Sequence, residues 1–114
     1  MAIAELYTGT EAVSTTEHSL TTDTAGPDSD TTDGVFQVFL DLNDMVAGDQ
    51  LQIRVYEKVT SSSTQRIVYE AILTGVQAQP VWVSPSLILM HGWDVTLDAL
   101  AGTITVDWSI RQVA

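Results

Sequence analysis

The sequence predicts an all-β protein, an antiparallel β-sandwich of the jelly-roll type with about eight short strands and an N-terminal arm. Three observations predict it. Apolar and polar residues alternate with a period of two through most of the chain. Turn-forming segments recur about every ten residues, and no stretch carries the periodicity of a three-turn helix. The length of 114 residues favours a single domain that buries a core without disulfides.

The predicted sandwich core covers residues 35–114. The tract 60–64 is predicted to close a hairpin, and residues 43–49 are predicted to form one helical turn. Pro80 and Pro85 predict an edge strand or a bent strand. The segments with strand-like alternation are 34–42, 50–59, 65–74, 80–90, 93–98 and 103–111. The side chains predicted to face the core are Phe36, Val38, Leu40, Leu42, Leu51, Ile53, Val55, Trp93, Val95, Leu97, Ile104, Val106, Trp108 and Ile110.

The first third of the chain is less regular. Residues 1–20 form the predicted N-terminal arm, whose two weak strand candidates, 4–7 and 12–20, are expected to pack on the domain or on a neighbour. Residues 21–34 have no apolar face and are rich in Thr and Asp, so they are predicted to form an acidic surface loop. Loops of this length inside small domains are often functional.

The charge balance limits the partners. Fifteen acidic residues against four basic ones give a formal net charge of −11. Such a surface repels phosphate backbones and anionic lipids, so neither a nucleic acid nor a membrane is an expected partner. The start of the chain lacks the features of a signal peptide. The longest apolar run, 87–90, is far shorter than the ~20 residues that span a bilayer.

No pattern of residues indicates catalysis, a cofactor or a metal. No serine stands in a Gly-x-Ser-x-Gly turn, and a chain without cysteine would need carboxylates beside His18 and His91 to hold zinc. Asp28, Asp30 and Asp33 precede a glycine, but their spacing departs from an EF-hand and no closing Glu follows. A solvated loop is therefore preferred over a cation site, and the chain is predicted not to be an enzyme.

The candidate functional residues are instead ones suited to contact with another protein. Trp82 lies between Pro80 and Pro85, and tryptophan is enriched at interface hot spots. Arg54, Tyr56 and Lys58 share the outward face of one predicted strand, although the two cations could equally pair with acids of neighbouring strands. The predicted interface residues are Leu6, Tyr7, Arg54, Tyr56, Lys58, Trp82 and Pro85.

Several segments resemble small structural proteins of tailed-bacteriophage virions, of the decoration or minor structural type. The resemblance rests on residues 33–42, 54–59, 64–69, 85–96 and 107–111, and the first 20 residues also fit it. It implies a virion component and no catalytic residue.

The resemblance leads to an expected function as a capsid decoration (cement) protein on the outer surface of a phage head. The expected partners are the major capsid protein or other virion subunits, together with copies of the chain itself, with a trimer favoured. The N-terminal arm could add a strand to a neighbour's sheet. One alternative is a tail, neck or baseplate adaptor. A second is a carbohydrate- or receptor-binding sandwich that uses Trp82 and the acidic loop, and a hydrolase is the weakest candidate.

Overall fold

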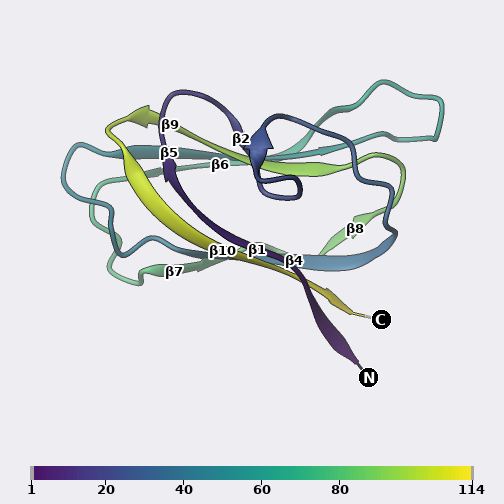
Figure 1. The fold of residues 1–114 in the computed structure, drawn as a ribbon, viewed down its shortest axis with the longest axis horizontal. Coiled ribbons are helices and arrows are strands. Elements are labelled where there is room, and N and C mark those ends of the chain that lie inside the picture. Colours follow the sequence, from purple (N-terminus) through teal and green to yellow (C-terminus); the bar gives the residue numbers. More distant parts are fainter. Residues whose placement is uncertain (1, 114) are drawn as a thin grey trace.

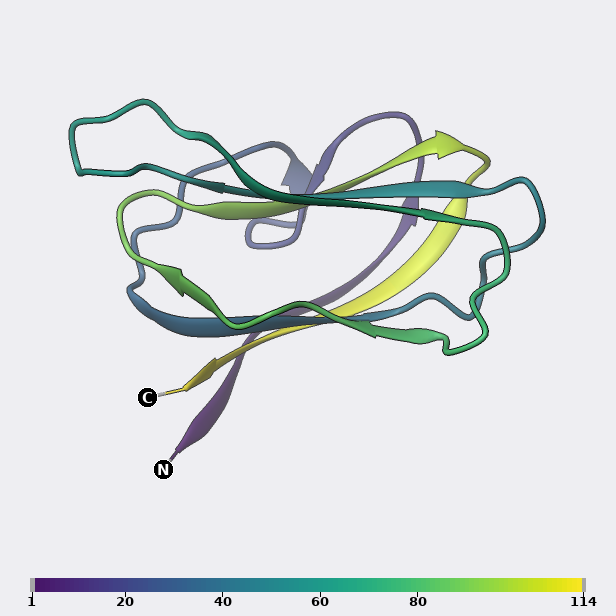
Figure 2. The ribbon, with the colours of Figure 1, turned by 180° about the vertical axis from the view of Figure 1, so that it is seen from behind.

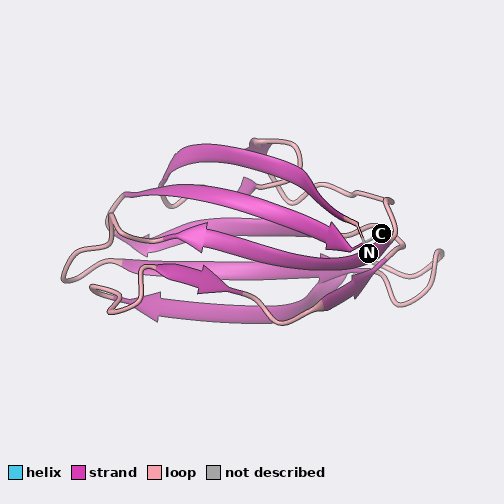
Figure 3. Ribbon diagram, turned by 90° about the horizontal axis from the view of Figure 1, so that it is seen from below, coloured by secondary structure: helices cyan, strands magenta, loops and turns pink. Residues whose placement is uncertain are grey.

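Two antiparallel sheets of five strands each face one another across a single core (Figure 1), and the described residues consist of strands and loops alone (Figure 3). The computed structural model describes residues 2–113. Met1 and Ala114, the first residue of the predicted arm and the last of the predicted core, lie outside that range. Residues 2–113 contain no helix, and hence none long and apolar enough to cross a membrane. The predicted all-β antiparallel sandwich is confirmed.

The strand order defines the two layers. The first sheet runs β1 (Ile3–Val13), β10 (Ile104–Val113), β4 (Gly34–Asp41) and β7 (Val81–Val83), with β8 (Leu87–Leu89) also paired to β4. The second sheet runs β3 (Thr24–Ala25), β2 (His18–Ser19), β9 (Asp94–Ala101), β5 (Gln50–Glu57) and β6 (Arg66–Thr74).

The pairing is nested along the chain. β1 pairs with β10, β2 with β9, β4 with β7 and β8, and β5 with β6, all antiparallel. Strands far apart in sequence therefore lie side by side, and the start of β1 lies beside the end of β10 (Figure 1). β10 and β9 then pair with β4 and β5, which joins these pairs into the two sheets.

The core is formed as the alternation predicts. All of the side chains predicted to face it are at most 3 % exposed. The predicted hairpin is also present, since β5 and β6 pair along their length and the amide of Ser63 donates to the carbonyl of Thr60 in the connection. The period-two alternation predicts the buried residues correctly because each sheet buries one face against the other sheet.

The N-terminal region differs from the two weak strands expected there. β1 is a single long strand that pairs with β10 from Ile3 to Val13, with an irregularity between Glu5 and Tyr7. Gly9 makes this pairing possible because a Cβ at this position would lie 2.3 Å from Cζ2 of Trp108. Residues 3–13 therefore belong to the sandwich itself.

Two local predictions need correction. The predicted helical turn at 43–49 is wrong, because this connection consists of two tight turns closed by Met45 N to Leu42 O and Asp49 N to Val46 O, both 3.1 Å. Gly48 has φ +92, and a carboxylate oxygen of Asp49 accepts from the amide of Val46, which together favour a turn. The predicted single strand at 80–90 is divided into β7 and β8 around Pro85, and the short strand β3 lies within the predicted acidic loop. Residues 2–113 therefore form ten strands instead of about eight.

Candidate interaction surfaces

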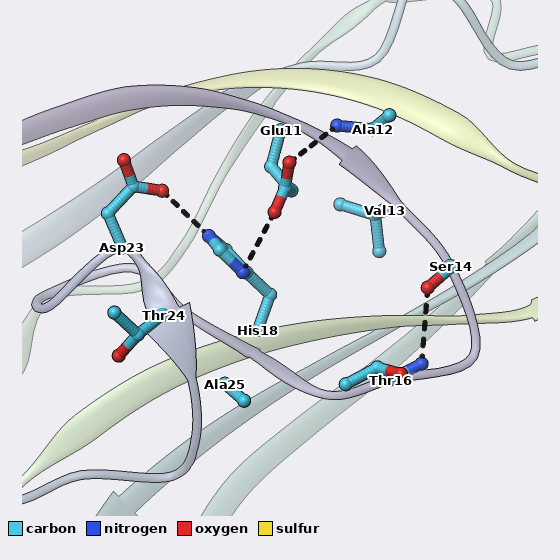
Figure 4. A pocket seen from close by; sticks show the side chains of 9 residues that line it. All are labelled: Glu11, Ala12, Val13, Ser14, Thr16, His18, Asp23, Thr24 and Ala25. Atoms are coloured by element: carbon cyan, nitrogen blue, oxygen red, sulfur yellow. Dashed lines mark hydrogen bonds and ion pairs between the residues drawn. The ribbon is translucent and has the colours of Figure 1, made fainter.

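A buried histidine connects β1, the edge strand of the first sheet, to β2 of the second sheet (Figure 4). His18 on β2 is 8 % exposed, and its Nδ1 lies 3.2 Å from a carboxylate oxygen of Glu11 on β1. Its Nε2 lies 2.8 Å from a carboxylate oxygen of Asp23. The ring also packs edge-on against Trp108, with the ring centroids 5.6 Å apart. The cluster therefore joins β1 of the first sheet to β2 and the following turn of the second.

This cluster is arranged for cohesion. Both ring nitrogens of His18 are engaged by carboxylate oxygens, so neither is open to a substrate or to a nucleophilic hydroxyl. Ser14 and His18 line one pocket, but the hydroxyl of Ser14 accepts from the amide of Thr16 at 3.4 Å. These contacts therefore hold β1 of the first sheet and β2 of the second sheet together.

The acidic loop is bound to the sandwich by its own carboxylates. Asp30 accepts from the hydroxyl of Tyr7 and from the amide of Thr32, and its backbone exchanges two 2.8 Å hydrogen bonds with Trp93. Asp28 accepts from the hydroxyl of Thr22 at 2.6 Å. Burial and the carboxylate of Asp30 raise the pKa of Tyr7 to about 12. No group of three or more His, Asp or Glu side chains within residues 2–113 is placed to hold a metal ion.

The outer face of the second sheet carries a polar network around Arg54. The guanidinium lies 3.1 Å from a carboxylate oxygen of Glu70 and 3.7 Å from one of Glu17. Glu17 also accepts from the hydroxyls of Tyr56 and Thr96, each at 2.5 Å. Burial and the hydrogen bond to Glu17 raise the pKa of Tyr56. Burial alone would lower the pKa of Arg54, but hydrogen bonds, chiefly with Glu70, raise it overall.

Two buried acceptors in this network lack a partner. Gln52 and Asp98 lie opposite one another on β5 and β9. Gln52 Oε1 and Asp98 Oδ1 have no hydrogen-bond donor among the described residues. Burial raises the pKa of the Asp98 carboxyl above its ordinary value of 3.8; the charge of Arg54 opposes this shift, and those of Glu17 and Glu70 add to it. The folded protein therefore disfavours the charged form of Asp98.

We expect Asp98→Asn to be more stable than the wild type at neutral pH. A folded-state pKa above the unfolded value means that stability from this group is fully present below the unfolded pKa and is lost as the pH rises through the folded pKa. The asparagine removes that loss, and its amide can donate to Gln52 Oε1. Urea unfolding at neutral pH and below the usual aspartate pKa measures the difference, which should shrink at acid pH. A less stable variant at neutral pH contradicts the expectation.

The predicted interface residues are distributed over separate parts of the molecule. Leu6 and Tyr7 are half-buried on β1, and the Tyr7 ring packs edge-on against Trp93. Arg54 and Tyr56 lie together in the polar network described above. Lys58 lies with its aliphatic part over Gly92. Trp82 is half-buried against the core, and Pro85 is exposed on the same sheet edge.

An exposed apolar row that sequence reasoning missed crosses the outer face of the first sheet. Ile3, Val113, Val35 and Ile88 lie opposite one another in register on β1, β10, β4 and β8. Directly opposed residues share a face, and these four side chains are 68, 39, 37 and 81 % exposed, respectively. We call them the terminal row, since they lie beside the two chain ends. Alternation with Phe36 and Val38 places Val35 on the outer face of its strand, but the strands that bring its apolar neighbours beside it are distant along the chain.

Comparison with protein-family models, with curated proteins and with solved structures finds no match to this chain.

Proposed function

We propose that the chain is a structural protein of a tailed-phage virion, a capsid decoration protein that binds the outer surface of the head. The sequence resemblance supports this role. The nested strand pairing supports the jelly-roll form of the sandwich, which viral capsid domains and lectins use. Because one fold hosts many functions, the exposed surface has to carry the proposal.

The terminal row is the observation that carries it. Four apolar side chains in register on a sheet face form a surface suited to burial against another protein. A sheet face presents them on a rigid support, which suits contact with the wide surface of a shell. The net charge of −11 keeps the protein away from packaged DNA and so favours the outer side of the head. The proposed partner is the major capsid protein.

The test is binding of the purified chain to phage heads that lack it, followed by co-sedimentation and immunogold microscopy. We expect label over the head surface and saturable binding. Val35→Ser combined with Ile88→Ser should weaken that binding at least ~10-fold, because truncation of apolar contacts at an interface centre costs more than about 1 kcal/mol. Val59→Ser is the matched control, since Val59 is 81 % exposed but lies outside the terminal row.

A tail, neck or baseplate adaptor would use the same apolar contact, but immunogold microscopy would show the label at a different place on the particle. Label confined to tails would overturn the decoration role and support the adaptor. Absence of the chain from purified particles would overturn both.

A further inference from the structure

A long stretch of this strongly acidic chain carries no charge. Residues 71–93 contain no Asp, Glu, Lys or Arg, although the chain has 15 acidic and 4 basic residues. In a random arrangement of such a composition, a charged residue would be expected about every six positions. The neutral stretch includes the second half of β6, the connection to β7, and all of β7 and β8.

The fold brings these elements to one side of the sandwich. β6 is the last strand of the second sheet, and β7 and β8 form the edge of the first. Figure 2 looks onto this side, with β6 along the upper layer and β7 and β8 along the lower one. Within residues 2–113, β6 pairs only with β5, and β7 and β8 pair only with β4. Both sheets thus present an unpaired edge here, and we call this side, residues 71–89, the neutral flank.

The neutral flank is also apolar. Leu73, Trp82 and Leu87 point between the sheets but remain only half-buried there. A shallow hollow lies beside Trp82, lined by residues 77–79 and 81–83. The large apolar side chains of the flank that are exposed are Ile72, Val76, Val81, Val83 and Ile88. The neutral flank thus exposes apolar side chains and unpaired strand edges together, and both features favour association with another protein.

We propose that the neutral flank docks a second copy of this chain. Two copies that each carry a charge of −11 repel one another over most of their surfaces, so they can approach closely where neither has a charge. A basic partner would instead be recognised by carboxylates, which the flank lacks. The nearest acid on β6 is Glu70, and its carboxylate is already paired with Arg54 at 3.1 Å.

The geometry of β6 suits a two-fold contact. An antiparallel strand edge is self-complementary about a two-fold axis, because the same residues on both copies can exchange backbone hydrogen bonds. Pairing of β6 with β6 would extend the second sheet across both copies and cover Ile72 and its neighbours. This contact does not depend on binding to a phage head, since it is centred on the unpaired strand edges. Ile88 is the one residue that the neutral flank shares with the terminal row.

Sedimentation equilibrium of the full chain from micromolar to millimolar concentration tests the proposal. We expect a reversible dimer that tightens as salt is added, since screening weakens the repulsion between the acidic bodies. Ile72→Asp and Val83→Asp should each weaken the dimer at least ~10-fold by placing a charge in the contact. Val59→Asp adds the same charge outside the flank and should leave the dimer unchanged. A monomer at all concentrations, or a dimer insensitive to both flank substitutions, overturns the proposal.

Thiol labelling provides a second measurement that tolerates small losses of stability. The chain has no cysteine, so Ile72→Cys and Val59→Cys each introduce a unique thiol. We expect the labelling rate at position 72 to fall as protein concentration rises, and the rate at position 59 to stay constant. Equal concentration dependence at both positions overturns the assignment to the flank. A dimer that does not bind heads leaves this inference intact and refutes the proposed function, and a monomer that binds heads does the reverse.

Discussion

Replacing Trp93 with alanine is expected to destabilise the protein by about 3–5 kcal/mol, the usual range for removing a large buried aromatic side chain. Trp93 is fully buried, and its ring lies 4.6 Å from that of Phe36 between centroids. It also meets the edge of Tyr7, and its indole nitrogen donates to the carbonyl of Thr32 at 2.7 Å. From its position directly before β9, this side chain contacts β4, β1 and the acidic loop, so the cavity left by alanine would affect all three.

Urea unfolding followed by circular dichroism measures this effect, and Trp93→Phe is the matched control. Phenylalanine keeps most of the apolar contact but loses the donor to Thr32, so it should cost about 1–2 kcal/mol. Trp82 and Trp108 remain as fluorescence reporters in both variants. If alanine proves no more destabilising than phenylalanine, the ring contacts with Phe36 and Tyr7 do not hold this region together.

The sequence was sufficient for strands that bury one face. In β5, for example, Leu51, Ile53 and Val55 alternate with polar residues, and all three are buried as predicted. The same reasoning succeeds in β10. Such strands are predictable because a single physical requirement, one buried face, sets every second residue.

The sequence was insufficient where burial depends on residues far along the chain. The sequence of β1 has a weak strand pattern of its own. Its pairing depends on the fit of Gly9 against Trp108 on β10, which no local pattern shows. Asp94 and Thr96 alternate with the predicted core residues Trp93, Val95 and Leu97, and alternation alone would place them on a solvated face. Both are fully buried, because residues from the region before β4 cover that part of the second sheet.

For the candidate surfaces, too, the sequence predicts the local pattern but not the contacts between distant residues. Arg54 and Tyr56 do lie on the outward face of β5, but their partner Glu17 comes from a loop that no local pattern places there. The neutral stretch 71–93 is visible in the sequence, whereas its position along two unpaired sheet edges comes only from the topology. Composition thus predicts the chemistry of a surface, and the fold decides which pieces of it are contiguous.

Replacing Asp94 with alanine is the second change for which we expect a large effect, a loss of about 3 kcal/mol and release of the acidic loop. The Asp94 side chain is fully buried at the start of β9. One carboxylate oxygen accepts from the hydroxyl of Thr21 at 2.8 Å and from the amide of Val95 at 2.9 Å. The other accepts from the amide of Asp28 at 2.7 Å. Alanine leaves these donors without an acceptor, and hydrogen bonds to a buried carboxylate are the stronger kind.

The readout that separates local release from general destabilisation is amide hydrogen exchange. In Asp94→Ala the amides of Asp28 and Asp30 should exchange much faster than those in the centre of β5, because the loop loses its attachment while the core strands keep theirs. Asp94→Asn retains one oxygen acceptor but turns an amide group toward a donor, so it should lie between wild type and alanine in both stability and exchange. Uniform acceleration across the loop and β5 would show that Asp94 supports the whole sandwich and has no specific hold on residues 21–34.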